Sequence, residues 1–114
     1  MVNNILDAEI QLAAVREVRT ILEKGWCRFH MAIDILGNEV PCGSSEACKH
    51  CLLGAIYASA KRLSLNPTDF KIFFHRVSGL TSLTIFNDCS DSKEEVLALL
   101  DNVIDVLEAE KWKS

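Results

Sequence analysis

Apolar residues recur at helical spacing in four stretches of the chain. In the first, residues 8–24, they share one stripe, with Asp7 as an N-cap before it and Gly25 as a stop after it. In the second, a helix is expected from Ser44 or Ser45 to about Leu63. This stretch is apolar nearly all round, which is typical of a central buried helix.

Two more helices are predicted in the second half of the chain. Asn66 can cap a helix that begins at Pro67, places four apolar residues on one face and ends near Gly79. The last helix is expected from about Lys93 to Lys111, with Ser92 and Glu95 as a capping box. Its core face holds Val96, Leu99, Leu100, Val103, Ile104 and Leu107. The opposite side carries an acidic row, expected to be solvated: Asp101, Asp105 and Glu108.

The segments between these stretches lack a helical period. Residues 26–43 are expected to form a long irregular loop, with a possible short hairpin because Leu36-Gly37-Asn38 is a turn signal between Ile33 and Val40. Residues 80–91 are expected to form a short turn or a strand-like connector. The chain therefore predicts one all-α domain, residues 1–114, built as a compact bundle of about four helices.

Composition and charge argue against several classes of function. Of the 114 residues, 49% are hydrophobic and 25% are charged, which is ordinary for a globular protein. The net charge is -4 and no cluster of Lys and Arg occurs, so nucleic-acid binding is not expected. The first ten residues contain neither a basic region nor a long apolar run. We therefore expect a cytoplasmic protein without a membrane span.

Cysteine chemistry is the next candidate. Five cysteines are an odd number, and in a reducing compartment they are expected to be thiols, metal ligands or core filler rather than disulfides. Cys48 and Cys51 form one C-x-x-C pair, and Cys42 with Cys89 or His50 could complete a tetrahedral zinc site. A single pair inside a predicted helix is weak support for zinc. The absence of a preceding strand argues against a redox motif, so neither a metal nor another cofactor is expected.

We therefore interpret the stretch "CKHCLLGA" as part of a helix whose small residues allow close packing, rather than as a metal or redox site. On a helix, Gly54 shares a small-residue face with Ala47, Cys51, Ala55 and Ala58. Glycine inside a helix is unfavourable, so we expect a neighbour to press against Gly54. The expected neighbour is another helix or the Trp26 ring.

Several short motifs together resemble a family of small bacterial and phage proteins of unknown function. They are "GWC" at 25–27, a D-x-x-G-like turn in "DILGNEV", "CLLGA" at 51–55 and "FND" at 86–88. The last motif usually reads Trp-Asn-Asp in that family, so Phe86 is a departure. The resemblance covers roughly residues 12–108 and implies a shared helical fold. Its matching positions are Trp26, Cys27, Cys51, Gly54, Ala55, Asn87 and Asp88.

The sequence is compatible with two functions. The first is a cytoplasmic protein that binds another protein, in host regulation or phage counter-defence, with candidate binding residues Trp26, Phe86, Asn87 and Asp88. The second is a thiol-dependent hydrolase or transferase that uses Cys51 or Cys27 together with Asn87 and Asp88. The enzyme needs a base, and each of the three histidines is isolated in the sequence. Elimination therefore favours the binding protein, although Asn87 and Asp88 could equally cap the last helix.

Overall fold

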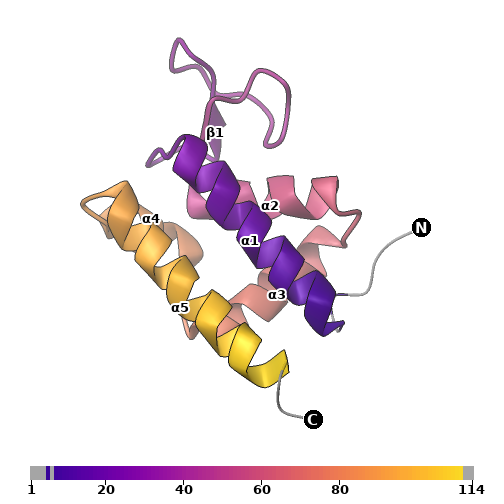
Figure 1. The fold of residues 1–114 in the computed structure, drawn as a ribbon. Coiled ribbons are helices and arrows are strands. Elements are labelled where there is room, and N and C mark those ends of the chain that lie inside the picture. The colour runs from indigo at the N-terminus through magenta and orange to yellow at the C-terminus, as the bar shows by residue number, and fades with distance from the viewer. Residues whose placement is uncertain (1–4, 6, 112–114) are drawn as a thin grey trace.

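The computed structural model describes residue 5 and residues 7–111, and within these the chain forms five helices and one two-stranded sheet (Figure 1). The elements in chain order are α1 (Ala8–Lys24), β1 (Ala32–Ile33), β2 (Lys49–His50), α2 (Leu52–Arg62), α3 (Pro67–Ser78), α4 (Leu83–Cys89) and α5 (Lys93–Lys111). The prediction of a mostly helical protein is confirmed, with five helices in the described residues rather than about four.

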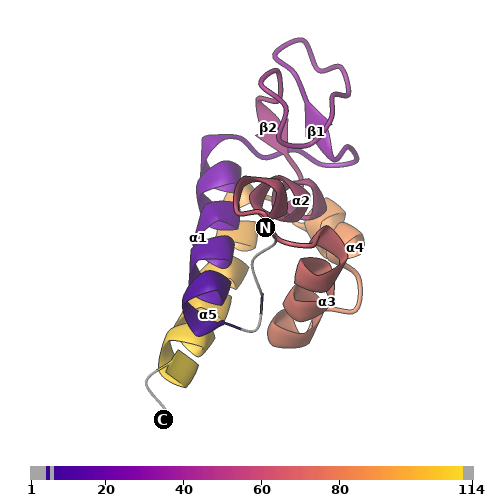
Figure 2. The ribbon, with the colours of Figure 1, turned by 90° about the vertical axis from the view of Figure 1, so that its right-hand side faces the viewer.

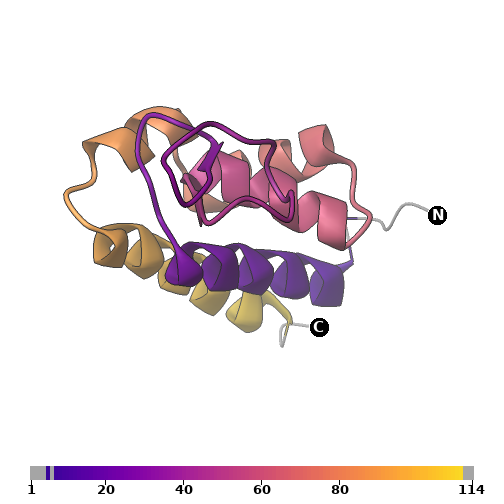
Figure 3. The same ribbon diagram turned by 90° about the horizontal axis from the view of Figure 1, so that it is seen from above.

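The helices lie in two layers. Figures 2 and 3 show α1 beside α5 in one layer and α2, α3 and α4 in the other. The core between the layers is apolar and includes the fully buried rings of Phe70 and Phe74 from α3. Ser59 of α2 is also fully buried, and its hydroxyl donates to the Ala14 carbonyl of α1 at 2.9 Å. Residues 25–51 rise above the helices as one loop that carries both strands (Figure 1).

The helices α1 and α5 run antiparallel, and ion pairs join their exposed sides. Arg16 pairs with Glu108 at 2.7 Å, and Arg19 pairs with Asp101 at 2.6 Å. These side chains are largely solvent-exposed, so each pair adds only about 0 to 1 kcal/mol to stability. Two of the three residues in the predicted acidic row thus face cations of the same chain.

Local capping signals mark the starts of α1 and α3. The Asp7 carboxylate accepts from the Glu9 and Ile10 N–H groups at the start of α1, and Asn66 accepts from Asp69 N–H at the start of α3. The predicted bounds of α1, α3 and α5 are confirmed. None of the helices in the described part of the chain has the length and apolar character that crossing a membrane requires.

The second predicted helix begins too early. It starts at Leu52 rather than at Ser44 or Ser45, and Cys51 is its N-cap. Residues 44–50 instead form turns and β2, because β2 pairs with β1 in the antiparallel register Ala32↔His50. These backbone bonds come from a distant part of the chain. Only His50 and Cys51 of residues 47–51 are buried, and Cys48 and Lys49 are exposed, so this stretch is not part of an apolar central helix.

Two other predictions need correction. Residues 83–89, within the expected turn or strand-like connector, form the helix α4, which Ser82 caps by accepting from Ile85 N–H at 3.1 Å. The possible hairpin between Ile33 and Val40 is present only as an isolated bridge from Ile33 to Glu39. The regular pairing of β1 is with β2 instead.

Candidate functional site

The side chain of Asn87, in the last turn of α4, is fully buried where three segments of the chain meet. Its Oδ1 accepts from Trp26 Nε1 at 2.7 Å and from the Leu52 backbone N–H at 3.0 Å. Its Nδ2 donates to the Cys27 carbonyl and to Asp88 Oδ1, both at 3.1 Å. A side-chain amide can accept two bonds and donate two, so Asn87 is satisfied within the protein. We call these five residues the Asn87 junction.

Asp88 and Arg28 extend this junction along the loop. Asp88 Oδ1 also accepts from the Phe29 N–H at 2.9 Å, and Phe29 holds a positive φ of 73°. Arg28 Nη1 donates to the Ser90 carbonyl at 3.3 Å, and the Arg28 guanidinium lies 5.8 Å from the centroid of the Trp26 ring. The segment that follows α1 is therefore fixed to the C-terminal end of α4.

Two glycines allow the loop backbone to pack closely. A Cβ atom at Gly25 would lie 2.2 Å from the Cys48 carbonyl oxygen, and one at Gly54 would lie 2.0 Å from the Met31 carbonyl oxygen. Both separations are far below van der Waals contact. A neighbour pressed against Gly54 was predicted correctly, but the neighbour is loop backbone rather than a helix or the Trp26 ring.

The small-residue face of α2 is correspondingly shorter than predicted. Ala47 lies outside the helix, in the loop, and Cys51 lies at its N-cap. Gly43 of the loop lies against Ala58, since a Cβ built on Gly43 would be 3.3 Å from the Ala58 Cβ. The loop, rather than a further helix, therefore covers this face.

The two candidate nucleophiles are buried. Cys51 Sγ accepts from the Gly54 N–H at 3.3 Å, yet burial raises the pKa of this thiol. Cys27 Sγ donates to the His30 carbonyl at 3.4 Å, and burial raises the Cys27 pKa to about 11. Both groups are therefore neutral thiols near pH 7, which is the less nucleophilic form.

The histidines do not form a base for these thiols. His50 is buried, its Nε2 accepts from the Gly43 N–H at 3.2 Å, and burial lowers its pKa. His30 Nδ1 lies 2.7 Å from Glu39 Oε1, and His75 Nδ1 lies 2.9 Å from the Leu80 carbonyl. Within residues 7–111, no imidazole is hydrogen-bonded to Cys27 or Cys51.

The structure thus brings Trp26, Cys27, Asn87 and Asp88 together in one junction, with Cys51 beside it. Phe86 is half-buried and packs against the core. The cysteines considered for zinc differ in exposure: Cys48 and Cys89 are exposed, whereas Cys51 is buried. Among the described residues, no three His, Cys, Asp or Glu side chains lie together in a way that could hold a metal ion.

A known protein family matches most of the chain, including the residues described above. The family of unknown function DUF6197 matches residues 10–106, which span the helices from α1 to most of α5. The chain belongs to this family. As a member of DUF6197, it carries the Asn87 junction and the entire loop inside the matched region. Searches of the curated proteins and of the solved structures found no match. The predicted membership of a family of unknown function is confirmed, while its bacterial or phage origin stays a prediction.

One feature of this DUF6197 protein was not predicted from the sequence, an apolar turn in the loop. Ile35 is 86% exposed and Leu36 is 82% exposed, although both are large aliphatic residues. Asp34 Oδ1 accepts from the Leu36 and Asn38 N–H groups, both at 2.9 Å. The Gly37 N–H donates to the Asp34 carbonyl at 3.0 Å. We call residues 34–38 the Ile35–Leu36 turn. The turn itself was predicted, and the aliphatic pair at its centre was the available signal.

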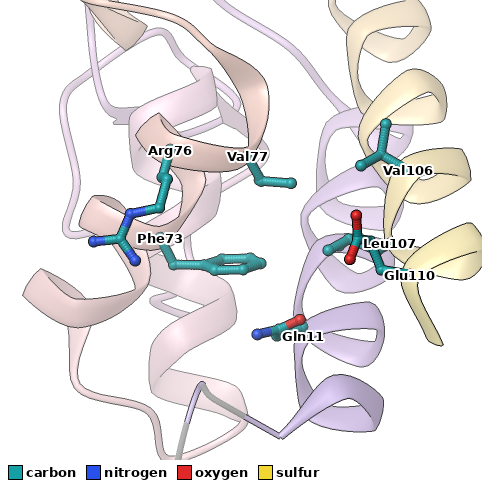
Figure 4. Close-up of a pocket in the computed structure, with 7 residues that line it drawn as sticks. All are labelled: Gln11, Phe73, Arg76, Val77, Val106, Leu107 and Glu110. Carbon is teal, nitrogen blue, oxygen red and sulfur yellow. The ribbon is translucent and has the colours of Figure 1, made fainter. Parts of the chain in front are cut away.

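A groove of about 300 Å³ lies elsewhere, between α3 and the layer of α1 and α5. Figure 4 shows Phe73 and Val77 of α3 directed toward Val106 and Leu107 of α5. The Arg76 guanidinium points away from the facing helix in this view. Gln11 and Glu110 complete the lining, so the groove is apolar with an amide and a carboxylate at its edge.

Proposed function

We propose that this protein acts by binding another protein, and that the Ile35–Leu36 turn is the part that enters the partner. The observation that carries the proposal is the exposure of two adjacent aliphatic side chains, 86% and 82%, at the tip of a protruding loop. Turn tips are ordinarily polar or glycine-rich, because an apolar side chain there remains in water. Large exposed apolar residues grouped in this way are typical of interaction sites.

The turn is well ordered for such a role. Backbone and carboxylate hydrogen bonds within residues 34–38 hold its shape before a partner arrives. Binding therefore loses little conformational entropy at this point. Complete burial of both side chains would contribute about 3 to 6 kcal/mol, at about 1.5 to 3 kcal/mol for each.

The Asn87 junction supports this role from below. It fixes the start of the loop to α4. The pairing of β1 with β2 fixes the segment before the turn, and the bridge from Ile33 to Glu39 closes the turn. In this proposal, the predicted binding residues Trp26, Phe86, Asn87 and Asp88 hold the loop in place rather than touch the partner. Substitutions among them would weaken binding through the position of the turn.

The finer parts of the proposal come from the family resemblance. It supports a bacterial or phage setting, in which a small cytoplasmic binding protein would serve host regulation or counter-defence. The alternative, a thiol-dependent enzyme built on Cys51 or Cys27, has less support. Both thiols have raised pKa values, and among the described residues neither is hydrogen-bonded to an imidazole ring.

The test is a pull-down from native host cells with three forms of the protein as bait. The variant Ile35→Ser/Leu36→Ser removes the apolar tip, and Ile85→Ser removes an aliphatic side chain that is 65% exposed on α4. The parent and Ile85→Ser should each recover one stoichiometric protein, and the double variant should lose it while melting like the parent. Equal recovery by the double variant would place the contact elsewhere. If none of the three recovers a stoichiometric protein, the proposed function is wrong.

A further inference from the structure

The middle part of the loop, which carries the Ile35–Leu36 turn, has carboxylates but no Lys or Arg. Residues 31–48 contain Asp34, Glu39 and Glu46 and no Lys or Arg. From this charge and the exposed aliphatic pair, we infer that the partner presents an apolar cleft rimmed by Lys and Arg side chains. The inference rests on the proposed function and adds the chemistry of the partner surface.

Two of the three carboxylates flank the aliphatic pair in the chain. Asp34 opens the turn, and Glu39 follows it directly. Glu39 and Glu46 are both exposed, while Asp34 is half-buried because its Oδ1 caps the turn. The Asp34 carboxylate lies at the turn itself, so its field reaches a surface docked there.

The nearest cations are held at the base of the loop. Lys49 lies in β2 beside Gly25, and the Lys61 side chain of α2 lies near Gly43. Arg28 donates to the Ser90 carbonyl at the end of α4. His30 Nδ1 lies 2.7 Å from Glu39 Oε1, directly after the turn. The tip therefore keeps an excess of negative charge.

Charge at the rim of an interface acts mainly on the rate of association. Complementary rims speed diffusional encounter, and salt at physiological ionic strength screens charges that lie more than about 8 Å apart. Like charges repel, so the same carboxylates disfavour anionic membranes and nucleic acid as ligands. A basic rim around an apolar cleft satisfies both properties of the tip.

The experiment uses a photoreactive side chain beside the turn. In Asn38→p-benzoylphenylalanine, illumination in native host lysate links the protein to whatever contacts the turn, and mass spectrometry identifies it. The identified protein is then purified, and its association with the parent chain is measured between low and high salt. The neutralised variant Asp34→Asn/Glu39→Gln/Glu46→Gln keeps every side-chain shape. Asp34→Asn also keeps the oxygen that caps the turn.

A matched control separates local charge from net charge. Asp91→Asn/Asp105→Asn/Glu110→Gln removes three exposed carboxylates far from the turn in the chain and changes the net charge equally. We expect the parent and this control to associate about 10-fold faster at low salt than at high salt. The neutralised variant should associate about 10-fold more slowly at low salt and show little salt dependence. Ile35→Ser/Leu36→Ser should instead speed dissociation and leave the salt dependence unchanged.

Each other outcome has a defined meaning. If the neutralised variant associates as fast as the parent, or faster, the inference is wrong while the proposed function survives. If vesicles of phosphatidylcholine and phosphatidylserine bind the parent but not the double serine variant, the turn enters a membrane, and both the inference and the proposed function are wrong. Sedimentation of the parent as an oligomer that the double serine variant dissolves would make the partner a second copy, and would also overturn the inference. If nothing is cross-linked, the proposed function fails, and the inference fails with it.

Discussion

The Asn87 junction makes a strong prediction about stability. In Asn87→Ala, the Leu52 N–H loses its acceptor at a fully buried position, and Trp26 Nε1 and the Cys27 carbonyl lose their partner as well. A buried polar group left without a partner costs about 1 to 3 kcal/mol. Three such losses would sum to about 3 to 9 kcal/mol. Trp26 is half-buried, so its N–H can bond water instead, and we expect a fall of about 3 to 6 kcal/mol in the free energy of unfolding, a large part of the roughly 5 to 15 kcal/mol typical of a domain.

Urea unfolding followed by circular dichroism measures this change, and thermal melts should show a drop of about 15 to 30 °C. Asn102→Ala is the matched control, because Asn102 is an exposed asparagine on α5 and its replacement removes no buried bond. The control should melt within a few degrees of the parent. A loss of less than about 1 kcal/mol for Asn87→Ala would refute the view that the junction holds the loop to the helices.

The variant Asn87→Asp tests the same reasoning through pH. It keeps an acceptor for Trp26 and Leu52 but places a second carboxyl beside Asp88 in a buried site. Burial and the neighbouring charge raise the pKa of the introduced carboxyl above its value in the unfolded chain. The folded state then binds more protons, so stability relative to the parent should fall as pH rises from about 4. Urea midpoints for both proteins at pH 4 and pH 7 measure this. A smaller deficit at pH 7 would contradict it.

Three other predictions concern the loop and its thiols. Gly54→Ala should lower stability by about 1 to 3 kcal/mol because its Cβ would meet the Met31 carbonyl oxygen; an unchanged thermal melt would contradict the close packing. Cys51→Ser should stay within about 1 kcal/mol of the parent in urea unfolding, since a hydroxyl can accept the Gly54 N–H as the thiol does, and a much larger loss would show that the sulfur packs in a way oxygen cannot. The raised pKa of Cys27, about 11, should keep it slow to alkylate at pH 8 while the exposed Cys48 reacts quickly, as peptide mass spectrometry would show. Because the unfolded thiol has the lower pKa, the Cys27 contribution to stability should be full below about pH 8.5 and disappear as pH rises through about 11.

The parts of the fold that follow from short-range signals were predictable. The helices α1, α3 and α5 combine a polar cap with a repeated apolar stripe, and both signals lie within the element itself. The helix α4 was missed because seven residues give too short a period, although Ser82 is a good cap. The start of α2 was misplaced because its cap is Cys51, and a thiol is not a residue that signals a helix start.

The candidate site was predictable only as a set of residues. The motifs pointed to Trp26, Cys27, Asn87 and Asp88, but no spacing rule relates Trp26 to a side chain 61 residues later. That contact depends on how α4 docks beside the loop. The choice between capping and a pocket for Asn87 therefore required the structure, which shows a buried amide that binds backbone from two other segments. The exposed apolar turn could have been predicted, because Ile35 and Leu36 lie directly before Gly37 and Asn38 in a turn signal.

The cap that Asn87 gives to α2 also sets an order of events during folding. The Leu52 N–H is one of the first free donors of α2, and its acceptor comes from a residue 35 positions further along the chain. Bonds of this kind close long loops of chain, so they form after the local turns of each helix. During synthesis, the first turn of α2 and the segment after α1 remain unanchored until α4 has left the ribosome. A chain cut after α3 would lack the acceptor for the Leu52 N–H and could not hold the Ile35–Leu36 turn in a fixed place.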